Sequence, residues 1–285
     1  MIWLNGNFED SGKISPSDRG FLLGDGVFET LYATCTGVVY FDQHWQRLIT
    51  ALEVVDINIP YSPNDIQNVC QELINHMHGV TNGENNNNNQ LQPFVLRLSV
   101  SRGNGGRGLA INPDAQPSWL ITAALCPPPP QSVTLHVSTL CRPSTNLTSR
   151  IKSLSYMDNI LARKEATSAG ADEALLLNEA GLVCCAAASN IFIFKNNNWI
   201  TPPISDGTLD GIIRGEILNM GKLDGAPIRE ESLTLAQVQE ADYIFICNSL
   251  TGAVPVVEIN GLPKEKSPAM QAISEIHKSE KVIDT

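Results

Sequence analysis

Four consecutive prolines at residues 127–130 divide this sequence into two parts. Proline fixes φ and has no backbone N–H, so such a run forms a stiff extended segment that joins neither a helix nor a central strand. We therefore predict an N-terminal α/β domain at 1–125, an interdomain linker at 126–132 and a larger C-terminal domain at 133–285. With 285 residues and 42% hydrophobic content, the chain can bury a core in each domain.

The N-terminal part mixes strand and helix patterns. Apolar, β-rich runs predict strands at 2–5, 26–41, 94–102 and 119–125, with a hairpin at Thr36-Gly37. One helix is expected after Asp42 as its cap, and a second is expected to open at Ser62-Pro63 and stop at Gly79. The segment 17–20 is expected to be a loop, and residues 79–93 form a low-complexity loop to which we assign no function.

The C-terminal part alternates strands and helices. Strands are predicted at 133–140, 173–178, 190–195 and 242–248, and the asparagines at 196–198 predict a hairpin turn. Helices are predicted at 154–169, 211–222, 233–239 and 267–279. This pattern favours a mixed α/β (α+β) domain without internal repeats.

Charge and composition exclude several function classes. Nineteen basic and 30 acidic residues give a net charge of −11, which argues against nucleic acid or an anionic membrane as partner. The N-terminus has no basic, apolar signal pattern and no run approaches 18 apolar residues, so we expect a cytoplasmic protein. Seven scattered cysteines without a C-x-x-C pair indicate reduced thiols and no metal site.

Lys152 is the first candidate for chemistry. It lies just before the predicted helix at 154–169, whose buried face is expected to hold Leu154, Met157, Ile160, Leu161 and Ala166. Partial desolvation lowers the pKa of a lysine, and a neutral amine can form a Schiff base with a carbonyl. On the residues alone, the alternative is an ordinary lysine that extends its amine to solvent.

Further motifs accompany this lysine over most of the chain. They read Ile151-Lys152-Ser153-Leu154, Asn159-Ile160-Leu161-Ala162-Arg163, Ala171-Asp172-Glu173-Ala174 and Asn190-Ile191-Phe192. Together they resemble the class IV (fold type IV) family of pyridoxal-phosphate enzymes, which includes branched-chain and D-amino-acid aminotransferases and aminodeoxychorismate lyase. The resemblance implies a two-domain fold type IV enzyme, pyridoxal 5'-phosphate as cofactor, Lys152 as the Schiff-base lysine, and a homodimer.

The resemblance also implies a set of cofactor-binding residues. The run 44–48 (HWQRL) is similar to a family motif whose arginine binds the cofactor phosphate, and 211–214 (GIIR) is similar to one whose helix start faces it. On the residues alone, Arg47 can be a surface charge, Gly211 part of a helix cap and Ser249 a turn residue. The expected cofactor contacts are Arg47, Lys152, Cys185, Asn190, Gly211, Ile212, Ile213, Ser249 and Leu250.

Cys185 departs from the family pattern. Five residues before Asn190, the family carries a glutamate that pairs with the pyridine nitrogen, and this chain has Cys185, preceded by Cys184. A carboxylate keeps the ring protonated as an electron sink, and a thiol is a weaker partner. We expect this substitution to hinder transamination more than a lyase reaction that gains aromaticity.

The glycine-rich run 101–108 (SRGNGGRG) is the main candidate for substrate binding. It leads into no helix, which excludes a dinucleotide fingerprint. It is similar to a run of aminodeoxychorismate lyases, and Arg107 matches a position that binds substrate carboxylate in D-amino-acid aminotransferases. Without the resemblance, Arg107 is equally a solvated loop residue. The expected substrate contacts are Phe28, Thr30 and Arg107, and no metal is expected.

The resemblance to aminodeoxychorismate lyases implies a lyase that converts 4-amino-4-deoxychorismate to 4-aminobenzoate and pyruvate through a Lys152 Schiff base. The runs 17–30 (SDRGFLLGDGVFET) and 246–250 (ICNSL) also resemble aminodeoxychorismate lyases. Two alternatives stay open. One is an aminotransferase of D- or branched-chain amino acids with a 2-oxo acid acceptor, and the other is a catalytically weak, cofactor-binding family member. In each case the expected partner is a small anionic amino compound.

Overall fold

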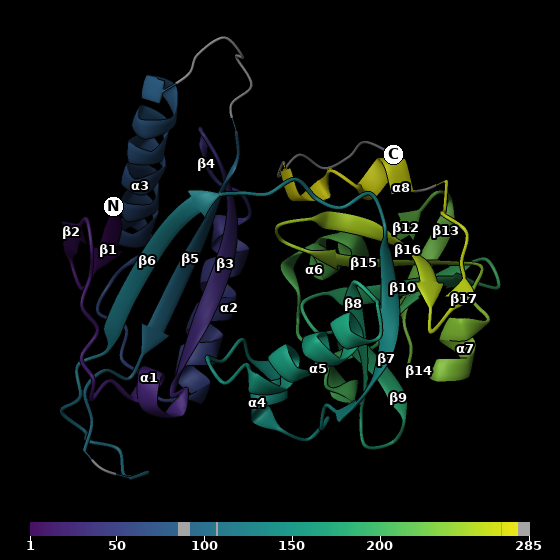
Figure 1. Ribbon diagram of the computed structural model, residues 1–285, viewed down its shortest axis with the longest axis horizontal. Coiled ribbons are helices and arrows are strands. Elements are labelled where there is room, and N and C mark those ends of the chain that lie inside the picture. Colours follow the sequence, from purple (N-terminus) through teal and green to yellow (C-terminus); the bar gives the residue numbers. More distant parts are fainter. Residues whose placement is uncertain (85–91, 107, 269, 279–285) are drawn as a thin grey trace. The chain divides into compact units, whose positions relative to one another are not determined.

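The structure, a computed structural model, describes residues 1–84, 92–106, 108–268 and 270–278. Contacts divide the chain into two compact units (Figure 1). The first contains Met1–Pro127 together with Lys152–Ser155, and the second contains Pro128–Ile151 and Tyr156–Thr285. Both units combine a sheet with helices, which confirms the mixed α/β class. The short piece Lys152–Ser155 follows the proline run in sequence, yet it packs with the first unit.

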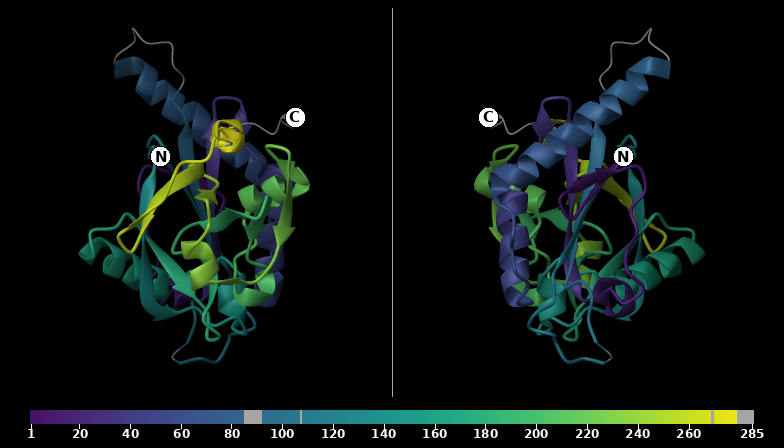
Figure 2. Two further views of the ribbon diagram at one scale, coloured as in Figure 1. Left: turned by 90° about the vertical axis from the view of Figure 1, so that its right-hand side faces the viewer. Right: turned by 90° about the vertical axis from the view of Figure 1, so that its left-hand side faces the viewer.

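Among the described residues, the first unit forms a six-stranded sheet of order β2-β1-β6-β5-β3-β4. Every neighbouring pair is antiparallel. Helices α2 and α3 pack against one face of this sheet (Figure 2). The elements are β1 (Ile2–Leu4), β2 (Asn7–Glu9), α1 (Arg19–Leu23), β3 (Gly26–Thr34), β4 (Gly37–Val38), α2 (Phe41–Val54), α3 (Pro63–Glu84), β5 (Phe94–Ser101) and β6 (Ser118–Leu125).

Three predicted helix limits in this unit are wrong. Asp42 is not a cap, because α2 starts one residue earlier, after Tyr40 in a left-handed conformation with φ 55°. Helix α3 passes Gly79 and ends at Glu84, since one glycine costs a helix only about 1 kcal/mol. The predicted loop at 17–20 contains the start of α1, where the Asp18 carboxylate accepts two backbone N–H groups.

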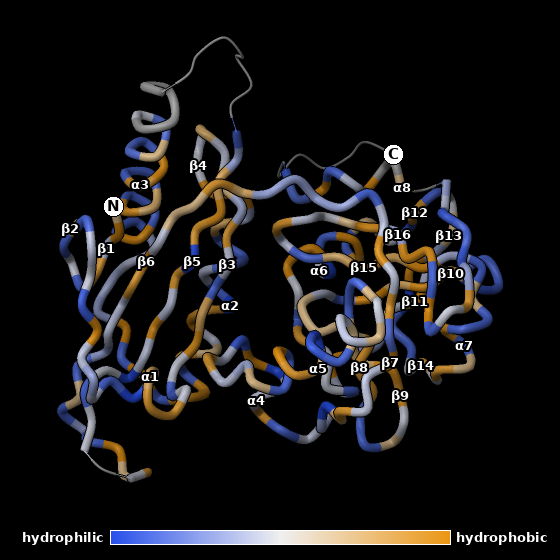
Figure 3. Tube along the Cα trace, in the orientation of Figure 1, coloured by the Kyte–Doolittle hydropathy of each residue, from blue (hydrophilic) through white to orange (hydrophobic). Residues whose placement is uncertain are grey.

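Among the described residues, the second unit forms an 11-stranded sheet, and Figure 3 shows apolar residues concentrated on its central strands. The predicted hairpin between β10 and β11 is confirmed, with Asn196 and Asn197 at φ 51° and 58°. The strands are β7 (Val133–Cys141), β8 (Glu173–Leu177), β9 (Leu182–Ala186), β10 (Asn190–Lys195), β11 (Asn198–Thr201), β12 (Lys222–Leu223), β13 (Ala226–Glu230), β14 (Leu233–Thr234), β15 (Tyr243–Asn248), β16 (Gly252–Ile259) and β17 (Leu262–Pro263). The helices are α4 (Leu147–Arg150), α5 (Met157–Ser168), η1 (Ile204–Asp206), α6 (Ile212–Asn219), α7 (Leu235–Gln239), α8 (Met270–Ile273) and η2 (Ile276–Lys278).

The predicted buried face of α5 is confirmed for Ala166 and wrong for the larger side chains. Met157, Ile160 and Leu161 are 62%, 57% and 42% exposed, whereas Ala162 and Ala166 are fully buried. Helix α5 packs against β7 and β8. The small alanine side chains allow a close approach of this helix to the sheet, and the larger side chains point away.

Two further properties concern the whole described chain. All seven cysteines carry free thiols, and Cys70, Cys184, Cys185 and Cys247 are buried. Within the described residues, no helix combines the length and the apolar character that crossing a membrane requires.

Candidate active site

Lys152 lies in a short extended segment that pairs with the start of β3. The backbone N–H of Phe28 donates to the carbonyl of Lys152 at 2.9 Å, and the N–H of Leu154 donates to the carbonyl of Gly26 at 2.9 Å. An isolated antiparallel bridge joins the two segments between these bonds. Lys152 is therefore the cross-strand partner of Phe28, and their side chains share one face of the sheet. The sheet, and not a helix start, fixes this lysine.

The ring of Phe28 contacts two cationic side chains. Lys152 Nζ is 4.5 Å from the ring centroid, and Arg97 Cζ is 3.8 Å from it. Arg97 stands opposite Thr30 in the register of β3 and β5, so all four side chains share this face. Each cation–ring contact contributes about 0.5–2 kcal/mol. The structure thus brings Phe28, Thr30 and Lys152 together and adds Arg97, which the sequence analysis missed.

Glu29 points to the other face of β3, where α2 packs, and holds two side chains of that helix. Arg47 Nε and Nη2 each donate to one oxygen of its carboxylate at 2.7 Å. His44 Nδ1 lies 2.8 Å from Oε2. Because the Glu29 side chain is only 2% exposed, this bidentate pair fixes the plane of the Arg47 guanidinium.

The charges of this cluster follow from the balance between burial and the neighbouring charges. Burial by itself would raise the pKa of Glu29, but the Arg47 charge and the bond to His44 outweigh it and hold that pKa well below its usual value. Burial lowers the pKa of His44, and the positive charges of Arg47 and Lys152 lower it further. Glu29 is thus ionised and His44 neutral, so His44 donates its Nδ1–H. Both Arg47 and Lys152 lie within electrostatic reach of this imidazole.

In the second unit, Asn190 hydrogen-bonds and packs against the residues at the start of α6. Asn190 Nδ2 donates to the carbonyl of Leu209 at 2.8 Å. A Cβ on Gly211 would lie 1.9 Å from Asn190 Oδ1, so only glycine fits there. Gly211 is the N-cap of α6, and because it has no side chain it cannot accept a hydrogen bond from the first backbone N–H groups of the helix. The first backbone N–H groups of the helix, from Ile212 and Ile213, therefore form a potential anion site.

Ser249 and Leu250 lie in the turn between β15 and β16, and Asn248 determines the shape of this turn. Asn248 Oδ1 accepts the backbone N–H groups of Leu250 and Thr251, both at 2.9 Å. Its Nδ2 donates to Ser189 Oγ at 3.0 Å, which links this turn to the one between β9 and β10. The N–H of Leu250 is thus already donated within the protein, while Ser249 is half-buried at the tip.

Cys185 lies on β9 opposite Leu176 and is 4% exposed. Burial raises the pKa of its thiol; the positive charge of Arg142 opposes this effect, and the negative charge of Glu173 adds to it. The thiol is therefore neutral near pH 7.

Arg107, the predicted substrate arginine, lies outside the described residues.

Comparisons with known proteins give matches over most of the chain. The family model described as amino-transferase class IV matches residues 26–259. A "Putative branched-chain-amino-acid aminotransferase" of Methanocaldococcus jannaschii is 35% identical over 91% of this chain and 88% of that protein. The aminodeoxychorismate lyase of Bacillus subtilis is 28% identical over 98% and 94%. A solved branched-chain amino acid aminotransferase of T.th., complexed with N-(5'-phosphopyridoxyl)-L-glutamate, is 24% identical, with a TM-score of 0.84 over 97% and 92% of the two chains.

Proposed function

Because this chain belongs to the class IV aminotransferase family, we propose that it converts 4-amino-4-deoxychorismate to 4-aminobenzoate and pyruvate. The protein is a pyridoxal-phosphate-dependent enzyme of fold type IV. Its substrates are small amino compounds, in keeping with its relatives. We also propose that the enzyme is a homodimer and acts in the cytoplasm.

The residues of each unit fit the cofactor. In the second unit, the uncapped start of α6 beside Gly211 suits a phosphate group. In the first unit, Arg47 offers a guanidinium whose plane Glu29 fixes, and Lys152 offers an amine on a rigid backbone. When bound, pyridoxal 5'-phosphate withdraws electrons from the amine-bearing carbon of the substrate, so that its proton can be removed.

Lys152 Nζ is the group that moves this proton. Two backbone hydrogen bonds fix its segment, and the Phe28 ring lies beside the amine. We assign to Nζ the removal of the proton from the amine-bearing carbon and its delivery to the methylene carbon of the departing enolpyruvyl group. Neither water nor an amino acceptor is consumed, because the two products together contain the atoms of the substrate.

The buried Cys185, at the position where the family carries a glutamate, is the observation that carries the lyase proposal. Transamination depends on a strong electron sink in both of its half-reactions, and a buried thiol does not keep the pyridine nitrogen protonated. Loss of pyruvate makes the product ring aromatic, and this gain offsets a weaker sink. Arg97 adds support, because it offers a cation for one carboxylate of a dianionic substrate on the same face as Lys152.

An aminotransferase is the second candidate. The 35% identity to the archaeal branched-chain relative favours it, and so does the apolar Phe28 beside the reacting amine. Lys152 would play the same part, and a 2-oxo acid would accept the amino group. The two candidates differ in one measurable respect, because only the aminotransferase requires the 2-oxo acid.

Cys185→Glu tests the argument from the thiol. We expect the rate of amino transfer from branched-chain or D-amino acids to a 2-oxo acid to rise by at least ~10-fold, because a carboxylate restores the sink. Cys185→Gln is the matched control, since it has the same shape without the charge and should show no gain. Rates are compared per cofactor-loaded protein. Equal rates in the two variants would remove the support that Cys185 gives to the lyase.

A further inference from the structure

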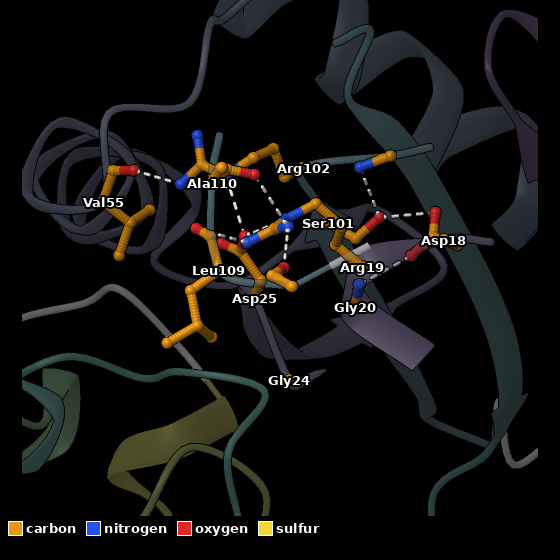
Figure 4. A network of polar contacts seen from close by, with 12 residues as sticks. Asp18, Arg19, Gly20, Gly24, Asp25, Val55, Ser101, Arg102, Leu109 and Ala110 are labelled. Carbon is orange, nitrogen blue, oxygen red and sulfur yellow. Dashed lines mark hydrogen bonds and ion pairs between the residues drawn. The ribbon is translucent and has the colours of Figure 1, made fainter. Parts of the chain in front are cut away.

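Asp25, the residue directly before β3, is held by two buried arginines. Arg19 Nε donates to Asp25 Oδ2 at 2.7 Å and Arg102 Nε donates to the same oxygen at 2.8 Å (Figure 4). The side chains of Arg19 and Arg102 are 5% and 7% exposed. The backbone is held as well, because the N–H of Arg102 donates to the Asp25 carbonyl at 3.1 Å. Asp25 therefore has little freedom to move.

The remaining donors of the two arginines attach this cluster to other parts of the first unit. Arg19 Nη1 donates to the carbonyl of Gly108 at 3.0 Å. Arg102 Nη1 donates to the carbonyl of Asp56 at 2.8 Å and Nη2 to that of Val55 at 2.5 Å, at the end of α2. Figure 4 shows Arg19 and Arg102 beside Asp25, with the carbonyl of Val55 bonded to this group. The cluster thus joins the start of β3, the end of β5 and the end of the helix that carries His44 and Arg47.

The residues on both sides of Asp25 accept hydrogen bonds from the segment that follows Lys152. The N–H of Leu154 donates to the carbonyl of Gly26 at 2.9 Å, and Ser155 Oγ donates to the carbonyl of Gly24 at 3.3 Å. A Cβ on Gly26 would lie 2.7 Å from Leu154 Cδ1, so the two segments also pack closely. Any shift of the backbone at Asp25 therefore moves both acceptors, and the lysine segment with them.

We propose that Arg19, Asp25 and Arg102 form a positioning element for Lys152. The inference rests on the proposed function in one respect, because it takes Lys152 as the reacting amine. Asp25 acts through the backbone of residues 24–28 and does not touch the substrate. Since the two arginines fix both the side chain and the backbone of Asp25, they set the strand start against which Lys152 pairs.

The test compares Asp25→Asn with Asp65→Asn in the cofactor-loaded protein. Asp65 is an exposed carboxylate of the same unit that caps α3 through Ser62, so the control makes the same chemical change away from Lys152. In Asp25→Asn we expect amide hydrogen exchange at Phe28 and Leu154 to accelerate by at least ~10-fold. We also expect kcat to fall by at least ~10-fold while KM changes by less than ~3-fold. A loss of folded protein would also lower the apparent kcat at unchanged KM, so kcat is calculated per folded, cofactor-loaded protein.

A second variant, Arg19→Lys, and a labelling rate at Lys152 test the same element. Arg19→Lys retains the charge but not the fork of donors, and we expect smaller changes in the same direction. The rate at which borohydride fixes pyridoxal 5'-phosphate to the Lys152 peptide should fall in both variants, whatever the substrate is. This rate and the amide exchange decide the inference even if no 4-aminobenzoate is formed. Exchange and labelling in Asp25→Asn equal to those of Asp65→Asn would overturn it.

Discussion

Lys152→Ala is expected to lower kcat by at least ~10⁴-fold, because it removes both the cofactor-binding amine and the base that moves the proton. The fold should persist, since Lys152 is only half-buried and its backbone bonds to β3 do not involve the side chain. Turnover and the visible absorption of the bound cofactor are the measurements. Both should be lost while the thermal unfolding midpoint changes little.

Two variants control for charge and for a general effect of losing a lysine. Lys152→Arg keeps a cation beside Phe28 but offers no reactive amine, and it should fail as completely as alanine. Lys164→Ala removes an exposed lysine of α5 and should leave kcat within ~2-fold of the wild-type value. Turnover by Lys152→Ala within ~10-fold of wild type would refute the assignment of the catalytic amine.

Glu29→Gln is expected to cost about 3 kcal/mol of unfolding free energy, because it leaves the partly buried Arg47 charge without its carboxylate. The affinity for pyridoxal 5'-phosphate should fall as well, since the bidentate pair with the carboxylate no longer orients the guanidinium. Urea unfolding of the cofactor-free protein measures the first effect, and a titration with the cofactor measures the second. Glu53→Gln, an exposed position on the same helix, is the matched control and should change neither.

The same cluster predicts how stability depends on pH. The pKa of Glu29 is lower in the folded than in the unfolded protein, so its stabilisation is present above about pH 4 and is lost as the pH falls further. Below about pH 4, the unfolding free energy of wild type should therefore decrease more steeply than that of Glu29→Gln. Parallel curves for the two proteins would show that Glu29 is not the ionised centre of this cluster.

The strands named in the sequence analysis were predictable from local sequence, whereas strands such as β9, β13 and β16 and the helix details were not. Alternation of apolar residues and the Asn196-Asn197 turn are local signals, and both hairpins follow from them. The start of α2 depends on the left-handed turn at Tyr40, a residue that rarely adopts it. The face of α5 depends on how closely the helix approaches β7 and β8, which periodicity alone does not reveal.

The candidate site shows the same division between local and long-range information. Arg97 could have been found from its strand, because the buried neighbours Leu96 and Leu98 put it on the opposite face. Its position beside Phe28 requires the register of β3 with β5, which joins residues far apart in sequence. The Glu29 cluster had one signal, a carboxylate inside an apolar run, but only the packing of α2 identifies its partners.

The most direct test of the lyase proposal is product formation from 4-amino-4-deoxychorismate without any 2-oxo acid. The cofactor-loaded protein should release 4-aminobenzoate and pyruvate in equal amounts, and Lys152→Ala should release neither. This result would support the proton transfer at Lys152 Nζ and the reading of Cys185 as a substitution that the lyase tolerates. If the wild-type protein releases no 4-aminobenzoate but transfers amino groups to a 2-oxo acid, the lyase proposal is wrong and the aminotransferase takes its place.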